Sequence, residues 1–146
     1  MRWAQRGFGV IAAIVVLVVL AVLAAAVVRF GSVAQSTNAQ NVRSARAIQA
    51  ARAATDWGLW QAFKGTWTSC SGVSQTLDLT ASTGFHVSVS CDSRTFNEGE
   101  SIPGTARSVR IYTIDAVACS SAACPDNAAA TAPNYIERRW QVQASD

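Results

Sequence analysis

Four cysteines are the residues whose chemistry is best defined by their number and position: Cys70, Cys91, Cys119 and Cys124. An even number of cysteines in a small domain favours disulfides formed in an oxidising compartment. Four cysteines permit three pairings, and we expect Cys70–Cys91 with Cys119–Cys124, because the second pair encloses only four residues. A zinc site built from all four thiolates is the alternative. It is disfavoured because the sequence lacks the paired short C-x-x-C-like spacings of such sites.

The single histidine, His86, does not predict a catalytic site. It lies between Phe85 and Val87 in an alternating segment, where a lone histidine most often faces solvent. Serine is so abundant in the chain that an apparent Ser–His–Asp set carries little information, and no nucleophile-elbow motif accompanies it. We therefore expect neither an enzyme nor a bound cofactor.

An acidic segment is the remaining candidate for metal chemistry. It contains Asp92, Asn97, Glu98 and Glu100, whose oxygens could bind calcium. Their spacing does not follow the D-x-[DN]-x-[DN]-G pattern of calcium loops. We interpret the segment as a solvated loop and expect no metal site.

The charges of the chain are unevenly distributed. Residues 1–63 contain six arginines and one acidic residue, whereas residues 64–146 contain six basic and eight acidic residues. A nucleic-acid-binding domain normally carries a basic excess on its own surface. The acidic balance of residues 64–146 argues against nucleic acid as a partner.

An apolar segment near the N-terminus predicts a membrane helix. No charged residue occurs from Phe8 to Val28, a stretch of 21 residues, and Arg2, Arg6 and Arg29 flank it. As a helix it would be about 31 Å long, close to the hydrocarbon thickness of a bilayer. We expect residues 8–28 to span a membrane once.

Residues 29–63 predict an amphipathic extension of the same helix. They contain no proline and are rich in alanine, glutamine and arginine, so a continuous helix from about Phe8 to Phe63 is expected. One weakly apolar face recurs at helical spacing, with Arg43, Arg46 and Arg52 largely on other sides. That face comprises Val33, Thr37, Ala45, Ile48, Ala51, Thr55, Leu59 and Ala62.

Residues 64–146 alternate with a period of two and predict a disulfide-bonded, β-rich domain. Strand patterns occur around residues 77–79, 85–91, 109–115 and 136–142, and loop signals occur around residues 82–84, 97–104 and 125–127. We expect an α+β fold in which a small antiparallel meander packs on the upper half of the long helix. Most of the four tryptophans Trp57, Trp60, Trp67 and Trp140 are expected in its core; an exposed adhesive patch is the alternative.

The N-terminal motif points to a family. A short basic leader, residues 1–7, ends in Gly7 and is followed at once by Phe8 and the apolar helix. This resembles the signal of type IV prepilins and pseudopilins. The resemblance implies that a prepilin peptidase cuts between Gly7 and Phe8 and methylates the new terminal Phe8. It also implies that the apolar helix stays in the mature protein, in contrast to a secretory signal.

The resemblance further implies which residues build a filament core. Lateral packing with other pilins would use the apolar helix, through Val10, Ile11, Ala12, Ile14, Leu17 and Leu20. Most pilins have glutamate as the fifth mature residue, where this chain has Ala12. A carboxylate without a partner would be costly in lipid, so its absence suits an anchor that stands alone. By analogy with minor pilins that lack this glutamate, the departure favours a minor subunit.

A second motif narrows the resemblance. The segment from Ala45 to Ala62, with its Gln-Ala-Ala-Arg-Ala run before Trp57-Gly58-Leu59, is similar to MshP-type biogenesis proteins of mannose-sensitive haemagglutinin (MSHA) pili. The likeness covers roughly the first 63 residues. It implies a minor pilin-like subunit in the bacterial inner membrane, with a periplasmic C-terminal domain that becomes surface-exposed in a pilus. The implied partners are other major and minor pilins, the prepilin peptidase, the inner-membrane assembly platform and the lipid bilayer.

Three alternatives to a minor pilin remain open at this point. A type II secretion pseudopilin would have the same N-terminus. A tip adhesin, or an exported single-span protein with a ligand-binding domain, would need an exposed concave or aromatic patch in residues 64–146. A secreted protein would lose a signal at Ala24-Ala25-Ala26 or at Ser32-Val33-Ala34, and would begin near Val27 or Gln35.

Overall fold

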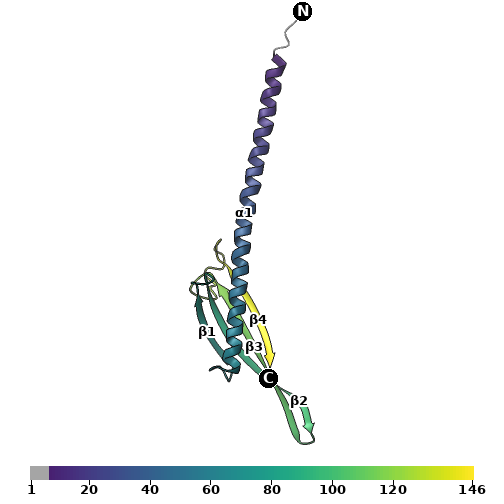
Figure 1. Cartoon of the computed structure of the whole chain (residues 1–146), viewed down its shortest axis with the longest axis vertical. Coiled ribbons are helices and arrows are strands. Elements are labelled where there is room, and N and C mark those ends of the chain that lie inside the picture. Colours follow the sequence, from purple (N-terminus) through teal and green to yellow (C-terminus); the bar gives the residue numbers. More distant parts are fainter. Residues whose placement is uncertain (1–6) are drawn as a thin grey trace, which may run out of the picture. The chain divides into compact units, whose positions relative to one another are not determined.

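One long helix and four strands make up the fold. The computed structural model describes the backbone of residues 7–146 and the side chains of residues 9–31 and 34–146. Helix α1 spans Gly7–Phe63, followed by β1 (Ser71–Leu79), β2 (Phe85–Ile102), β3 (Thr105–Cys119) and β4 (Glu137–Ser145). The strands form one antiparallel sheet in the order β1-β2-β3-β4 (Figure 1). The expected α+β arrangement and its meander are confirmed.

The chain divides into two units within α1. The first unit ends at Asn41, and the second comprises Val42–Asp146. The described part of the first unit is helical throughout. The second unit contains the C-terminal part of α1 and the whole sheet, and it holds the core.

The core of the second unit is built from small residues on α1 and branched residues on the sheet. Small side chains let the helix backbone approach the sheet closely, where valine and isoleucine fill the remaining space. On α1 the buried apolar residues are Ala47, Ala50, Ala51, Ala54 and Ala62. On the sheet they are Phe85, Val87, Val89 and Cys91 of β2 and Tyr112, Ile114, Ala116, Ala118 and Cys119 of β3.

The buried face of α1 differs from the predicted one. Ala51, Thr55 and Ala62 are buried as expected, but Ala45 is exposed and Ile48 and Leu59 are only partly buried. The centre of the contact is instead formed by Ala47, Ala50, Ala54 and Gly58. In an alanine-rich helix all faces have nearly the same hydropathy, so the larger Ile48 and Leu59 biased the prediction. The face of α1 that packs against the sheet is the one with the smallest residues.

The C-terminus of α1 is closed by backbone and side-chain hydrogen bonds. The Gly65 N–H donates to the Trp60 carbonyl at 3.0 Å, and the Trp67 N–H donates to the Gln61 carbonyl at 3.0 Å. The Thr66 N–H donates to Gln61 Oε1, also at 3.0 Å. These bonds satisfy carbonyls that a helix end otherwise leaves without a partner. They reverse the chain so that it enters the sheet at β1.

The hairpin of β2 and β3 is longer than expected. Residues 97–104 were predicted as a loop, but the two strands pair as far as Ile102 and Thr105, leaving only Pro103 and Gly104 at the turn. The register shifts between Asn97 and Gly99 and again between Glu100 and Ile102. Gly99 has a φ of 102°, which only glycine adopts readily. The glycine that suggested a loop therefore forms a bulge within a strand.

The tryptophans divide between core and surface. Trp67 is buried, and its ring meets that of Trp57 edge-on at 5.1 Å between centroids. Trp60 is 57% exposed, and Trp140 is 37% exposed with the Arg52 guanidinium 4.1 Å above its ring centre. Trp67 thus lies in the core and the partly buried Trp57 packs against it, whereas Trp60 and Trp140 are exposed, so the expectation that most of the four lie in the core is wrong.

Candidate functional site

The apolar segment of α1 presents its side chains outward on every side. Val10, Ile14, Leu17 and Leu20 are between 56% and 66% exposed within the chain. Thirteen large apolar residues from position 10 to position 28 are exposed in this way. Soluble monomers rarely expose a continuous apolar surface larger than a few hundred Å². The segment therefore needs an apolar environment all around it, as lipid or neighbouring apolar helices provide.

This part of α1 is long and apolar enough to cross a membrane. A helix satisfies its own backbone hydrogen bonds, which is the requirement for a chain in hydrocarbon. Ala12 lies on it and is exposed, as are the other residues expected in a filament core: Val10, Ile11, Ile14, Leu17 and Leu20. Their shared exposure makes these side chains accessible to a neighbouring helix.

The proposed cleavage site lies at the beginning of the described chain. The backbone of Gly7 and Phe8 is helical and opens α1. Residues 1–6 of the expected leader lie outside the described residues, as does the side chain of Phe8. The first turn of α1 contains no acidic residue.

The first disulfide, Cys70–Cys91, fastens the end of α1 to the sheet. Both cysteines are fully buried, and their Cα atoms are 5.1 Å apart. Cys70 follows the helix by seven residues and has a φ of 42°, while Cys91 lies in the central strand β2. The bond covalently fixes the chain reversal between α1 and β1. The pairing expected from the sequence is confirmed.

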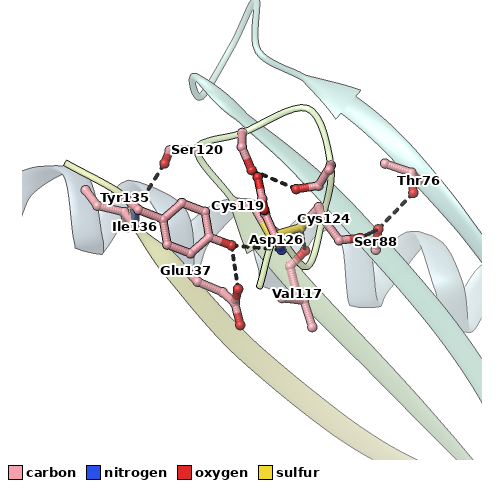
Figure 2. The surroundings of a disulfide bond; sticks show 12 residues. Thr76, Ser88, Val117, Cys119, Ser120, Cys124, Asp126, Tyr135, Ile136 and Glu137 are labelled. Atoms are coloured by element: carbon pink, nitrogen blue, oxygen red, sulfur yellow. Dashed lines mark hydrogen bonds between the residues drawn. A yellow bond between two sulfur atoms is a disulfide. The ribbon is translucent and has the colours of Figure 1, made fainter. Parts of the chain in front are cut away.

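The second disulfide, Cys119–Cys124, closes a short loop after β3, as expected (Figure 2). The hydroxyl of Ser88 donates to the Cys124 carbonyl, and it also shares a 2.8 Å hydrogen bond with the hydroxyl of Thr76. The first bond holds the loop against β2, and the second joins β2 to β1 beside it. The peptide bond between Cys124 and Pro125 is cis.

Tyr135 braces the rest of the connection between β3 and β4, after the disulfide loop (Figure 2). Its hydroxyl donates to Glu137 Oε2 and accepts a hydrogen bond from the Asp126 N–H at 3.2 Å. Partial burial and the neighbouring Glu137 carboxylate raise the pKa of Tyr135. The neutral phenol is therefore the form that the fold favours.

An ion pair between a buried carboxylate and an exposed arginine lies on the face of the sheet that α1 does not cover. Asp115 on β3 is 9% exposed, and Arg139 on β4 donates to it through Nε and Nη2 at 2.7 Å each. The Asp115 carboxylate raises the pKa of Arg139. A hollow of about 360 Å³ lies beside the pair, under Cys124 and Pro125, and hydroxyls of Ser74, Thr76, Ser88 and Ser90 line it. The sequence did not single out this pair, because only the strand register brings the two residues together.

The acidic segment is engaged in local contacts. Asp92 Oδ1 accepts a hydrogen bond from the Gly72 N–H at 3.1 Å, and Glu98 pairs with Arg107 at 3.1 Å. Glu100 Oε2 accepts from the Gly104 N–H at 2.9 Å and so braces the hairpin turn. Across the described part of the chain, no three histidine, cysteine, aspartate or glutamate side chains gather as metal ligands. These carboxylates are part of a long hairpin; the prediction of a loop was wrong.

His86 lies opposite Asp78 in the β1–β2 pairing. Its Nδ1 is 3.8 Å from Asp78 Oδ1, and its side chain is 22% exposed. Asp78 also accepts hydrogen bonds from the side chain and backbone of Thr80, and these bonds lower the pKa of Asp78. The arrangement closes the β1–β2 turn.

Comparison of the chain with protein-family models, with curated proteins and with solved structures finds no match.

Proposed function

We propose that this chain is a minor, structural subunit of a type IV pilus-like filament of the MSHA type. The observation that carries the proposal is the Gly7–Phe8 junction at the start of a 21-residue apolar segment without charge. A processed, methylated Phe8 would leave this segment as an anchor in the inner membrane. Its exposed apolar side chains would then pack against other pilins when the subunit enters a filament.

The second unit supports this proposal as a compact, disulfide-bonded domain. Two disulfides and a core between α1 and the sheet suit a domain that must remain folded outside the cytoplasm. Arg43 and Arg46 are exposed on the helical part of this unit. They offer contacts to acidic surfaces of adjacent subunits or to anionic lipid headgroups.

The position of Ala12 favours a minor over a major subunit. Without a carboxylate at that position the helix lacks the group that pairs with the terminal amine of a neighbouring subunit in most pilins. Placing this helix in lipid also carries no cost for an unpaired charge. The subunit would work with other pilins, the prepilin peptidase and the assembly platform, and it would catalyse no reaction itself.

The test is the N-terminus of the protein taken from membranes. We expect intact mass and N-terminal sequencing to give a chain that begins with N-methylated Phe8, and only in cells that contain the prepilin peptidase. Gly7→Val should abolish processing. Gly9→Val is the matched control, because a Cβ at Gly9 would meet nothing within 4 Å, and it should be processed normally.

Two other results would exclude the proposal. A chain that begins near Val27 or Gln35 regardless of the peptidase would identify a removable secretory signal. An intact Met1 in both strains would identify a plain membrane anchor.

A further inference from the structure

The projecting part of the β2–β3 hairpin carries an exposed aromatic residue beside a hollow. The last residue of β2 that pairs with β1 is Asp92, and pairing of β3 with β4 begins only at Ile111, so the hairpin continues beyond both neighbours (Figure 1). Phe96 lies on this projection and is 48% exposed. The hollow has a volume of about 630 Å³ and lies on the face of the sheet opposite α1. Its lining comprises Asp92, Ser93, Arg94, Phe96, Ile111, Thr113 and Gln143.

The position of Phe96 is not explained by the core of its own chain. Phe96 pairs across the hairpin with Val109, away from the residues that α1 covers. A half-exposed aromatic ring retains much apolar surface in water, and such rings are common anchors of protein interfaces. The hollow falls within the roughly 300–1,000 Å³ of pockets that enclose small molecules, so it has room for an aromatic ring. Anchor and pocket therefore lie side by side on one surface.

We propose that this surface, the Phe96 face, binds the Phe96 face of a second copy of the chain. In a two-fold arrangement the same patch serves both partners, so each Phe96 ring enters the hollow of the other copy. Ile111 contributes apolar lining for the ring, and Thr113 and Gln143 contribute polar lining to the same hollow.

The charges at the rim fit the same partner. Asp92 and Arg94 both line the hollow and have opposite charges. In a dimer with a two-fold axis at this surface, Arg94 of each copy would face Asp92 of the other copy. The surface can thus be self-complementary in charge, which is the reason for choosing a second copy as the occupant. The Phe96 face belongs to the sheet, so this proposal does not depend on the filament role of α1.

The test measures self-association of the full chain in detergent micelles by sedimentation equilibrium. We expect a reversible dimer that Phe96→Ser weakens by about 30-fold, the loss typical of a central aromatic anchor. Thr113→Trp, which fills the hollow and leaves Phe96 in place, should weaken it to a similar degree. Ile102→Ser is the matched control: it removes an apolar residue that is 64% exposed on the same hairpin but does not line the hollow. It should change the affinity by less than about twofold.

The charge pair gives a second measurement. Asp92→Lys should weaken the dimer, and adding Arg94→Glu to that variant should restore it, because the exchanged charges again oppose each other. Near-ultraviolet circular dichroism of each variant checks that the fold is kept.

Three outcomes would overturn the proposal. One is a wild-type chain that stays monomeric at all concentrations, which would leave the hollow to a different partner. Another is a dimer indifferent to both Phe96→Ser and Thr113→Trp, which would place the contact on α1. The third is an equal loss with Ile102→Ser, which would indicate unspecific apolar association.

Discussion

Replacing Gly58 by alanine is expected to destabilise the second unit, although alanine is the better helix former. Gly58 is on the face of α1 that meets the sheet. A Cβ at this position would lie 2.7 Å from Ile114 Cγ2 and 3.0 Å from Val89 Cγ1. Ile114 and Val89 are fully buried, so neither side chain can move into solvent. The helix must therefore move away from the sheet or the two side chains must leave their preferred rotamers.

The size of the effect follows from two opposing contributions. Overpacking of this kind costs about 1–3 kcal/mol. The higher helix propensity of alanine offsets about 0.8–1.0 kcal/mol of that cost. The free energy of unfolding should therefore fall by about 1 kcal/mol. With a urea m-value of about 2 kcal/mol/M, the unfolding midpoint moves down by about 0.5 M.

Urea unfolding of the full chain in detergent micelles, followed by tryptophan fluorescence, measures this shift. Trp57 and Trp67 lie in the contact region and report on it. Ala53→Gly is the matched control, because Ala53 is exposed on the same helix and only propensity acts there. It should cost about 0.8–1.0 kcal/mol, so alanine is favoured over glycine at position 53 and disfavoured at position 58.

A double-mutant cycle isolates the contact. In an Ile114→Ala background the closest methyl group is absent, and Gly58→Ala should become neutral or stabilising through helix propensity alone. A Gly58→Ala variant as stable as the wild type in the original background would refute the close approach of α1 to β3.

Two further predictions concern the disulfides and Tyr135. Replacing both cysteines of a pair by alanine should lower the free energy of unfolding by about 3 kcal/mol for Cys70–Cys91 and by about 2 kcal/mol for Cys119–Cys124. The first loss is larger because the first bond joins residues 21 positions apart and the second joins residues 5 positions apart. Calorimetry of the two double variants measures both losses, and the reverse order would contradict the chain-entropy argument. The raised pKa of Tyr135 means that its contribution to stability is fully present below the unfolded pKa near 10 and is lost as the pH rises through the higher folded value. Unfolding midpoints between pH 8 and pH 11 should therefore fall less steeply in Tyr135→Phe than in the wild type, and equal slopes would show that the phenol does not contribute.

The long helix and the meander could be predicted because their signals are local. Residues 8–63 contain no proline, and period-two alternation places Phe85, Val87, Val89 and Cys91 on one face of a strand, where they are indeed buried. The disulfide pairing could be preferred because the spacing of Cys119 and Cys124 is short.

Other features depend on contacts that no local pattern contains. In β3 both faces carry apolar residues, so the alternation did not show that Tyr112 and Ile114 face α1 while Ile111 faces away from it. The register of the sheet brings Arg139 to Asp115, two residues that are 24 positions apart. The hollow beside Phe96 likewise needs residues from three strands.

The Cys70–Cys91 bond also determines how the second unit carries mechanical load. Tension applied between α1 and the sheet would pass from Cys70 directly into Cys91 on β2, so β1, which lies between the two cysteines, bears none of it. The 21 residues of that loop represent about 70 Å of contour length, at about 3.4 Å per extended residue. Under oxidising conditions the intact disulfide prevents this segment from extending when α1 is pulled away from the sheet. Reduction of the bond would release it and turn a stiff connection into an extensible one.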